Sequence, residues 1–405
     1  MREPIKWARN EMPKTDCSKI LSLMSGEEIK KVYEFHRSFP QYKETPLVNL
    51  SHLAAYFGIK GIFVKDESFR FDLNAFKVLG GSYAIAKYIA FHLGKDIAEI
   101  DYNALISDET KEKLGDITFY TATDGNHGRG VAWAANRLRQ KAVVLMPKGS
   151  SQARLQNILK EGAEASITDL NYDDAVRLAN KMASNDPKGV IVQDTAWEGY
   201  EEIPGWIMQG YASMSFEAYS QMKLAGISRP THIFVQAGVG SLAGSVVGFF
   251  ANLFSSNPPL MTVVEASAAD CLYISNLAGK LVGVKGNLST IMAGLACGEG
   301  NTLSWEILKN YSRFFVSAPD WVASRGMRVL AVPLKGDNKV ISGESGAVTA
   351  GLLFTLLRDA EYKDFREALG INSESVVLLF STEGNTDPEK FRDVVWDGEF
   401  PSGDK

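Results

Sequence analysis

Short apolar runs alternate with helical patterns along most of this 405-residue chain, and this alternation limits the possible folds more than any other feature. From about residue 117, β-rich runs such as ITFYTAT, KAVVLMP and EASITD are each followed by a helix-like segment. Strands that alternate with helices form βαβ units around a parallel sheet. The runs THIFVQ and SVVLLF are apolar almost throughout, as expected for strands buried on both faces. We therefore expect an α/β fold that binds ligands in loops at the carboxyl ends of its strands.

Charge and cysteine content narrow the class of protein. The net charge of −5 argues against a nucleic-acid or acidic-membrane partner, because such partners favour a basic patch. The beginning, MREPIKWARNEMPK, has no apolar signal-peptide core, and the longest apolar stretch, 242–254, is too short to span a bilayer. We expect a cytoplasmic protein. Its three cysteines, Cys17, Cys271 and Cys297, have no CxxC spacing, so this compartment predicts reduced thiols, and we expect no metal site.

The first candidate for chemistry is Lys77, which lies among apolar residues and precedes two glycines in NAFKVLGGS. Most lysines are solvated surface charges, and that is the plain interpretation of any single one. Desolvation lowers the pKa of a lysine amine, however, and a neutral amine can form a Schiff base with a carbonyl compound. The apolar flanks therefore make Lys77 a candidate for covalent catalysis.

The second candidate is the run TATDGNHG, which directly follows the expected strand at 117–123. The plain interpretation is a strand-to-helix turn in which Asp or Asn caps the helix. Such a loop also presents backbone N–H groups at a helix N-terminus, where a substrate carboxylate could bind. For His127 a structural role is the main alternative. The candidates for substrate binding here are Thr123, Asp124, Gly125 and His127, and Asn126 is a candidate for bonding a cofactor oxygen.

The third candidate is the glycine-rich run QAGVGSLAG at 236–244, again between an expected strand and a helix. Glycines let the backbone approach a phosphate, and the helix N-terminus attracts it. The residues expected to do so are Gly238, Val239, Gly240, Ser241 and Leu242. As G-x-G-x-x-A, with Glu265 closing the next strand, the run also fits a dinucleotide fingerprint. A nicotinamide-dependent dehydrogenase is therefore an alternative.

Further polar residues stand where ligands could reach them. Ser381 and Thr382 follow the strand VVLLF, and a hydroxyl there could bond a cofactor ring nitrogen. Asp194 ends a β-rich run in VQDTAWEGY, and Glu344 lies in SGESG. The plain interpretation of each position is an ordinary turn.

In this order the candidate segments resemble the fold-type II pyridoxal-phosphate (PLP) enzymes of the tryptophan synthase β family. The longer strings LNAFKVLGGSYA, TDGNHGRGVAWAA, VQDTAWEGY, IMAGLACGE, ISGESGAV and STEGNTD resemble the diaminopropionate ammonia-lyases in particular. The likeness runs from about Pro46 to Trp396. Serine and threonine dehydratases usually have serine where this chain has Asp124, so this residue separates the two interpretations.

The resemblance implies a homodimer with two open, mostly parallel sheets flanked by helices in each chain. A large PLP-binding domain at 1–85 and 200–405, and a small inserted domain at 86–199, would have PLP between them. The implied contacts are Lys77 as the covalent attachment, Asn126 at the ring hydroxyl, Gly238–Leu242 at the phosphate, and Ser381, or less readily Thr382, at the pyridine nitrogen. The resemblance also implies that Cys271 and Cys297 can form a disulfide, against the expectation from the compartment.

The activity that the resemblance implies is α,β-elimination of D- and L-2,3-diaminopropionate to pyruvate and two ammonia. The leaving β-amine must depart protonated, and a carboxylate near it, Asp124 or Asp194, would favour the ammonium form. Two stereochemistries need bases on opposite faces, namely Lys77 and Asp124. The alternatives are a serine or threonine dehydratase, another PLP β-elimination or β-replacement enzyme, the dehydrogenase, and a non-catalytic binding protein.

Overall fold

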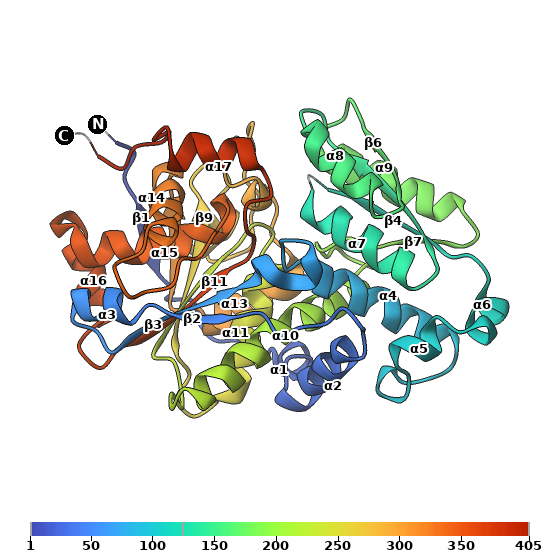
Figure 1. Cartoon of the computed structure of the whole chain (residues 1–405), viewed down its shortest axis with the longest axis horizontal. Coiled ribbons are helices and arrows are strands. Elements are labelled where there is room, and N and C mark those ends of the chain that lie inside the picture. Colours follow the sequence, from blue (N-terminus) through green and yellow to red (C-terminus); the bar gives the residue numbers. More distant parts are fainter. Residues whose placement is uncertain (1, 124, 404–405) are drawn as a thin grey trace. The chain divides into compact units, whose positions relative to one another are not determined.

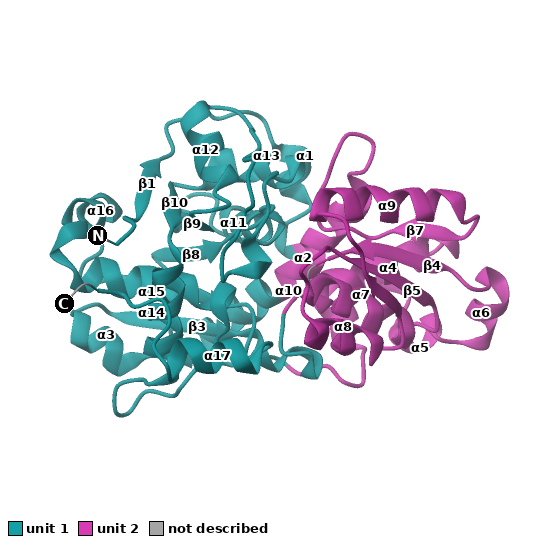
Figure 2. Ribbon diagram, turned by 90° about the horizontal axis from the view of Figure 1, so that it is seen from above, with its two compact units in different colours: residues 1–26, 44–75, 214–405 teal, residues 27–43, 76–213 magenta. Residues whose placement is uncertain are grey.

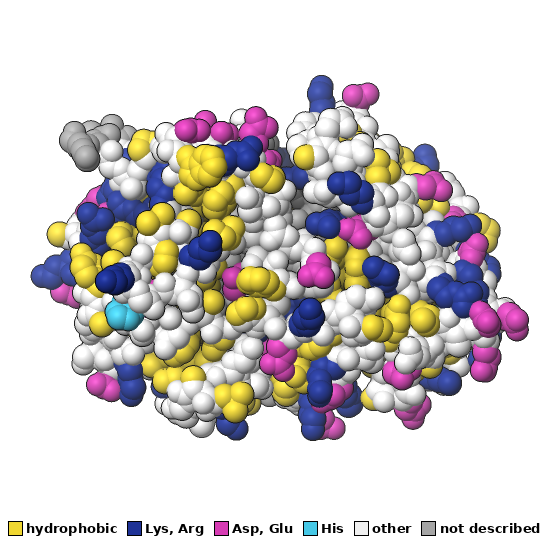
Figure 3. Space-filling view, viewed as in Figure 1, with side chains coloured by type: hydrophobic (Ala, Val, Ile, Leu, Met, Phe, Trp, Pro, Cys, Tyr) yellow, Lys and Arg dark blue, Asp and Glu magenta, His cyan; other side chains and the backbone are white. Residues whose placement is uncertain are grey.

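The computed structural model describes residues 2–123 and 125–403. The chain divides into two compact units, which Figure 2 shows in different colours. Unit 1 consists of residues 1–26, 44–75 and 214–405, and unit 2 consists of residues 27–43 and 76–213. Among the described helices, none has both the length and the apolar character needed to cross a membrane. On the face in Figure 3, basic and acidic side chains are interspersed.

Unit 1 is built on a sheet with the strand order β1-β10-β9-β8-β11-β3-β2, seven strands among the described residues. The five inner strands pair in parallel, and the edge strands β1 and β2 pair antiparallel. The runs THIFVQ and SVVLLF form β8 and β11, whose residues are all buried, as predicted. The strands are β1 (Lys6–Arg9), β2 (Leu47–Asn49), β3 (Gly61–Asp66), β8 (His232–Gln236), β9 (Leu260–Ala266), β10 (Phe314–Ala318) and β11 (Val376–Ser381).

Helices pack on this sheet and complete the main core of unit 1. Helices α14 and α15 lie side by side, and α15 contacts β8 and β11 (Figure 1). The core joins apolar residues of these helices to residues of the strands. The helical segments are α1 (Ser18–Ser22), α3 (Ser51–Phe57), η1 (Glu67–Asp72), α11 (Ser241–Leu253), α12 (Cys271–Ala278), η3 (Ala293–Leu295), α13 (Thr302–Tyr311), α14 (Asp320–Ala331), α15 (Glu344–Arg358), η4 (Ala360–Tyr362), α16 (Lys363–Leu369) and α17 (Pro388–Val395).

Unit 2 has a parallel sheet with the order β6-β5-β4-β7, four strands in the described part of the chain. They are β4 (Thr118–Ala122), β5 (Lys141–Met146), β6 (Glu164–Ile167) and β7 (Gly189–Ile191). Its helical segments are α2 (Gly26–Arg37), α4 (Val78–His92), η2 (Ile97–Glu99), α5 (Tyr102–Leu105), α6 (Asp108–Leu114), α7 (Asn126–Arg137), α8 (Gln152–Leu159), α9 (Tyr172–Asn185) and α10 (Glu202–Leu224), whose last part belongs to unit 1. Two mostly parallel sheets with helices confirm the predicted fold class.

The units do not divide at 86 and 199, where the resemblance placed the domain boundaries. Unit 2 begins at Phe76 because α4 packs closely on α7: a Cβ atom at Gly130 would lie only 2.8 Å from the Cα of Val78. It includes 27–43 because the buried ring of His36 lies 2.7 Å from the Ser213 hydroxyl. Both contacts join residues distant in sequence, so no local pattern predicts them.

A buried network of charges supports the segment that leads toward Lys77. The side chains of Lys65, Glu67, Arg70 and Glu217 are fully buried in unit 1. The Arg70 guanidinium is 2.8 Å from both carboxylates, and Lys65 is 2.6 Å from Glu217. Burial would raise the pKa of Glu217, but Arg70 and Lys65 hold that pKa well below its usual value. Because buried charges depend on their partners, this network fixes the backbone around η1.

Candidate active site

Lys77 directly precedes α4 in unit 2 and forms an ion pair with Asp194. Its Nζ atom is 2.7 Å from Oδ2 of Asp194, a carboxylate that follows β7 and is only 4 % exposed. Burial would raise the pKa of Asp194, but the charge of Lys77 and the nearby His127 hold that pKa well below its usual value. The structure therefore brings together two predicted catalytic residues and keeps the carboxylate ionised.

In the run TATDGNHG, Thr121 and Ala122 end β4 and Asn126 begins α7, as the sequence predicts. The Thr123 hydroxyl accepts a hydrogen bond from the Gly125 N–H at 3.1 Å. His127 Nε2 is 2.9 Å from the Val192 carbonyl, so Nε2 carries a proton, and Nδ1 is 3.9 Å from the Asp194 carboxylate. Asp124, the predicted second base, lies outside the described residues. Asn126 is the first residue of α7.

Unit 1 contains the predicted phosphate loop, which runs from the end of β8 into the N-terminus of α11. Gly240 has a φ of +100°, and a Cβ atom there would lie 2.8 Å from the Ser304 hydroxyl. Only glycine suits both conditions. The first N–H groups of a helix have no acceptor within the helix, and they attract an anion. The segment Gly238–Leu242 therefore has the geometry of a phosphate site.

In unit 1, the end of β11 is hydrogen-bonded to the SGESG run. The Ser381 hydroxyl donates to the Ser342 hydroxyl at 2.8 Å, and both residues are fully buried. The Thr382 hydroxyl accepts from the side-chain amide of Gln236 at 2.7 Å. Glu344, a predicted substrate ligand, begins α15. These contacts place Ser381, Thr382 and the start of α15 close to the end of β8.

Glu383 is a residue of this region that sequence reasoning missed. Its carboxylate accepts the N–H of Ser345 at 3.1 Å, and its carbonyl accepts the N–H of Gly343 at 2.9 Å. A carboxylate at a helix N-terminus is favourable, so Glu383 anchors α15. The only signal in the sequence was its place in STEGN.

The segment before Lys77 is strained and bonded to the same strand end. Phe71, Asp72 and Asn74 have φ values of 49°, 58° and 62°, a region that non-glycine residues seldom adopt. The Asn74 carbonyl accepts the N–H of Gly384 at 3.0 Å, and Ala75 forms an antiparallel β-bridge with Glu383. Such strain persists only where the surrounding structure imposes it. Contacts within unit 1 thus fix the backbone up to Ala75, two residues before Lys77.

Glu265, which made a dinucleotide fingerprint possible, has a structural role at the N-terminus of α12. Its buried carboxylate accepts the N–H groups of Leu272 and Tyr273 at 2.8 and 2.6 Å, so it caps α12. Burial raises the pKa of this carboxyl group well above its usual value. A buried carboxyl group whose oxygens already accept two N–H groups of α12 is poorly placed to bind a ribose, which weakens the dehydrogenase alternative.

Cys271 and Cys297 both lie next to Gly238, at the start of the phosphate loop. The Cys271 thiol is 3.9 Å from the Gly238 carbonyl, and a Cβ atom at Gly238 would lie 3.2 Å from the Cys297 sulfur. The structure shows Cys17, Cys271 and Cys297 in the thiol form. Burial raises the pKa of the Cys271 thiol, so its reactive thiolate form is disfavoured. The implied disulfide stays a prediction, and both sulfur atoms neighbour the same glycine.

Peptide mapping without reductant distinguishes the two states of this pair. In protein oxidised in air we expect a Cys271–Cys297 cross-link, because both sulfur atoms lie against Gly238, and we expect Cys17 to be alkylated. Full alkylation of Cys271 and Cys297 after unfolding of the unreduced protein would exclude the bridge.

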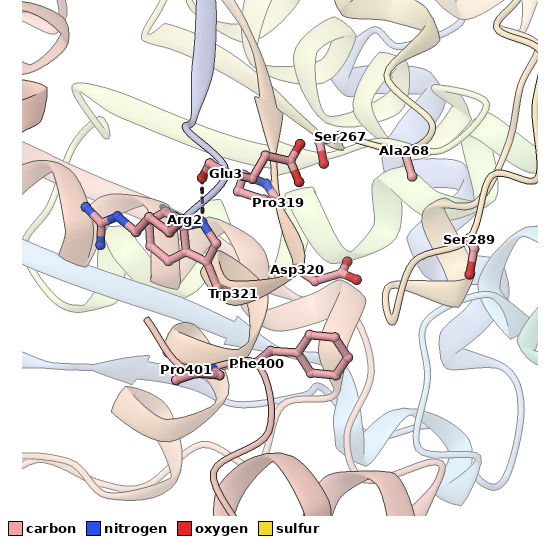
Figure 4. Close-up of a pocket in the computed structure, with 10 residues that line it drawn as sticks. All are labelled: Arg2, Glu3, Ser267, Ala268, Ser289, Pro319, Asp320, Trp321, Phe400 and Pro401. Carbon is pink, nitrogen blue, oxygen red and sulfur yellow. Dashed lines mark hydrogen bonds between the residues drawn. The ribbon is translucent and has the colours of Figure 1, made fainter. Parts of the chain in front are cut away.

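A separate cavity of about 420 Å³ opens in unit 1 beyond the ends of β9 and β10 (Figure 4). Its lining includes the carboxylates of Glu3 and Asp320 and the rings of Trp321 and Phe400. The Trp321 indole donates to the Glu3 carbonyl at 2.8 Å, and Thr290 bonds to Asp320. The cavity is lined by segments from both ends of the chain and contains no predicted site residue.

A lysine paired with a buried carboxylate, and a glycine-rich phosphate loop at a strand end of an α/β fold, define the chain as a PLP-dependent enzyme of fold type II. The model of the family described as "Pyridoxal-phosphate dependent enzyme" matches residues 39–381. The chain is 51% identical to the diaminopropionate ammonia-lyase of Salmonella typhimurium, over 98% of this chain and 99% of that protein. It therefore belongs to the diaminopropionate ammonia-lyase family of carbon–nitrogen lyases.

Solved structures agree with this assignment. The holo diaminopropionate ammonia lyase from Escherichia coli is 47% identical, with a TM-score of 0.91 and 98% of each chain covered. The same enzyme in complex with an aminoacrylate-PLP azomethine reaction intermediate is 46% identical, with a TM-score of 0.90 and 98% of each chain covered. The predicted family, fold type and PLP cofactor are thus confirmed. The residues present fit this cofactor: in unit 1 the loop before α11 ends at a helix N-terminus that attracts a phosphate, and in unit 2 Lys77 offers an amine.

Proposed function

We propose that this protein catalyses the α,β-elimination of D- and L-2,3-diaminopropionate to pyruvate and two molecules of ammonia. The observation that carries the proposal is the 2.7 Å ion pair between Lys77 and the buried Asp194. It supplies an amine for covalent attachment and a carboxylate suited to a cationic substrate. Membership of the diaminopropionate ammonia-lyase family supports the same substrate.

Pyridoxal phosphate, when bound, supplies the electron sink that stabilises negative charge at the substrate Cα. We propose that Lys77 attaches it and that the backbone of Gly238–Leu242 binds its phosphate. Asn126 would contact the ring hydroxyl, and Ser381, or less readily Thr382, the ring nitrogen. A neutral hydroxyl at the nitrogen suits elimination, because it leaves the ring unprotonated.

The remaining residues act on the substrate. Lys77 would take the Cα proton of one enantiomer, and Asp194 would favour the ammonium form of the β-amine, which must leave protonated. The low pKa of Asp194 supports this role, because an ionised carboxylate attracts a cation. The proposed substrate contacts are Thr123, Asp124, Gly125, His127, Asp194 and Glu344.

The test is a product assay with each enantiomer of diaminopropionate and with serine and threonine. One pyruvate and two ammonia per diaminopropionate are expected. A serine or threonine dehydratase would instead release one ammonia from its hydroxy amino acid. Turnover of serine or threonine, without any pyruvate from either enantiomer of diaminopropionate, would establish that alternative.

We further propose that Asp124 is the base for the D-enantiomer, since the sequence puts a carboxylate where simple dehydratases usually have serine. Asp124→Asn should lower kcat/KM for D-diaminopropionate by about 10²–10⁴-fold, the usual loss of a positioned base. The L-enantiomer should lose less, because Lys77 serves it. Asparagine also suits turns, so folding and PLP binding should survive. Equal losses for both enantiomers would assign Asp124 to substrate positioning, and unchanged activity would remove it from the mechanism.

A homodimer and a cytoplasmic location are also part of the proposal, supported by the family resemblance. Sedimentation equilibrium of the holoenzyme should give twice the chain mass of 44.4 kDa. A mass equal to one chain at micromolar concentration would contradict the dimer.

A further inference from the structure

We propose that Tyr211 is a positioning residue that orients Asp194 as a carboxylate, and that this pair selects substrates with a cationic β-amine as leaving group. The proposal rests on the function proposed above and deepens it by naming what determines its specificity. Tyr211 lies on α10, more than one hundred residues after Lys77, and no feature of the sequence pointed to it.

The Tyr211 hydroxyl donates to Oδ2 of Asp194 at 3.3 Å, and Lys77 donates to the same oxygen at 2.7 Å. Tyr211 is only 1 % exposed. Burial and the neighbouring carboxylate raise the pKa of Tyr211 well above its usual value, so its hydroxyl keeps its proton and stays a donor. Tyr211 therefore stabilises the carboxylate form of Asp194 without carrying a charge of its own.

Close packing fixes the position of this hydroxyl relative to Lys77. Helices α4 and α10 approach each other at glycines: a Cβ atom at Gly210 would lie 2.4 Å from the Leu79 carbonyl, and one at Gly80 would lie 2.5 Å from the Tyr211 ring. The Tyr211 ring also packs on Phe76 with 4.7 Å between centroids. The residues on both sides of Lys77 thus hold the tyrosine in place, so its hydroxyl has little freedom to turn away from Asp194.

Among the described residues, the side chains of Lys77, His127 and Tyr211 lie close to Asp194. Lys77 precedes α4, His127 on α7 has Nδ1 at 3.9 Å, and Tyr211 comes from α10. Lys77 is not a full counter-ion while its amine is used covalently, nor while it is the neutral base that takes the Cα proton. In both states the neutral hydroxyl of Tyr211 still stabilises the anion, and a buried anion attracts the next available cation strongly. The β-ammonium of diaminopropionate is such a cation, whereas a hydroxyl or chloride is not.

The chemistry makes this preference matter in the bond-breaking step. The Cα proton passes to a base, the Cα–Cβ double bond forms, and the electron pair of the Cβ–N bond leaves with nitrogen. Nitrogen departs as ammonia only if it enters the step as ammonium. Chloride from β-chloroalanine leaves with its electron pair and needs no proton, so its loss does not depend on Asp194 in this way.

The experiment compares the holoenzyme and Tyr211→Phe with L-diaminopropionate and β-chloro-L-alanine. Loss of a hydrogen bond to a charged group should lower kcat/KM for diaminopropionate by about 10- to 100-fold. For β-chloroalanine a change of at most about 3-fold is expected, so the ratio of the two values falls. Tyr83→Phe removes the hydroxyl of another buried tyrosine, on α4, and should leave both values within about 3-fold.

A second variant checks that Tyr211 acts through Asp194. Asp194→Asn should lower the same ratio, and adding Tyr211→Phe to it should cost no further selectivity, because the carboxylate that Tyr211 orients is gone. Equal losses for both substrates in Tyr211→Phe, or full additivity with Asp194→Asn, would overturn this inference alone. Absence of diaminopropionate turnover by the unmodified enzyme would overturn the proposed function and this inference with it.

Discussion

Replacing Lys77 with alanine is expected to lower pyruvate formation from diaminopropionate by about 10⁴-fold or more. The variant would lose a positioned base, worth about 10²–10⁴-fold by itself, and also the covalent attachment of the cofactor. It would leave the buried carboxylate of Asp194 without the amine that lies 2.7 Å away. Released pyruvate, followed in a coupled assay with saturating pyridoxal phosphate, measures the loss.

The same lysine should be the site of covalent labelling. Visible absorbance of the purified protein should be bleached by borohydride, and mass spectrometry should then find the pyridoxyl group on Lys77. Lys87→Met is the matched control, because Lys87 lies on the adjacent helix α4 and is also partly buried, within reach of Gln209. This control should keep the label and most of the activity. A label on any other lysine of the unmodified enzyme would end the assignment of Lys77.

Gly240→Asp is expected to abolish binding of pyridoxal phosphate. The φ of +100° is strained for any side chain, and the new Cβ would lie 2.8 Å from the Ser304 hydroxyl. The added carboxylate would also repel a phosphate at the N-terminus of α11. Visible absorbance of the variant after incubation with excess cofactor should therefore be close to that of apoprotein.

Gly279→Asp separates this effect from general damage. Like Gly240, Gly279 lies in unit 1 and has a positive φ, +67°. Unlike at Gly240, a Cβ atom at Gly279 would have no other atom within 4 Å. This control carries the same new charge and comparable backbone strain, and it should keep its cofactor. Circular dichroism of both variants shows whether they fold. A folded Gly240→Asp protein with normal cofactor absorbance would mean that the phosphate binds elsewhere.

Much of the architecture could be predicted because it depends on residues that are neighbours in the sequence. The runs that form β8 and β11 are apolar almost throughout because both faces of these strands are buried, and the helical patterns have a period of about 3.6 residues. The phosphate loop could also be predicted, because glycines between an apolar strand and a helix are typical of an anion-binding loop. The resemblance of six short strings then indicated the family, and the match of the pyridoxal-phosphate-dependent enzyme model over residues 39–381 confirmed the broader family.

Other features depend on contacts that no local pattern encodes. Tyr211 is one apolar-flanked tyrosine among 14 in the sequence, and only the packing of α10 on α4 brings its hydroxyl to Asp194. Glu265 fitted a nucleotide-binding pattern, but the fold turns its carboxylate onto the N-terminus of α12. The unit boundaries differ from 86 and 199 for the same kind of reason, because His36 and Gly130 make contacts far along the chain.

The sequence by itself therefore determined the α/β class, the family, the cofactor and the candidate lysine, because periodicity and short motifs reflect the conformation of neighbouring residues. Only the tertiary structure decided which carboxylate faces Lys77, which hydroxyl orients it and which acidic residues serve the fold. Those choices follow from the register of helices packed at glycines and from the burial of charged groups, which depend on residues that are distant in sequence.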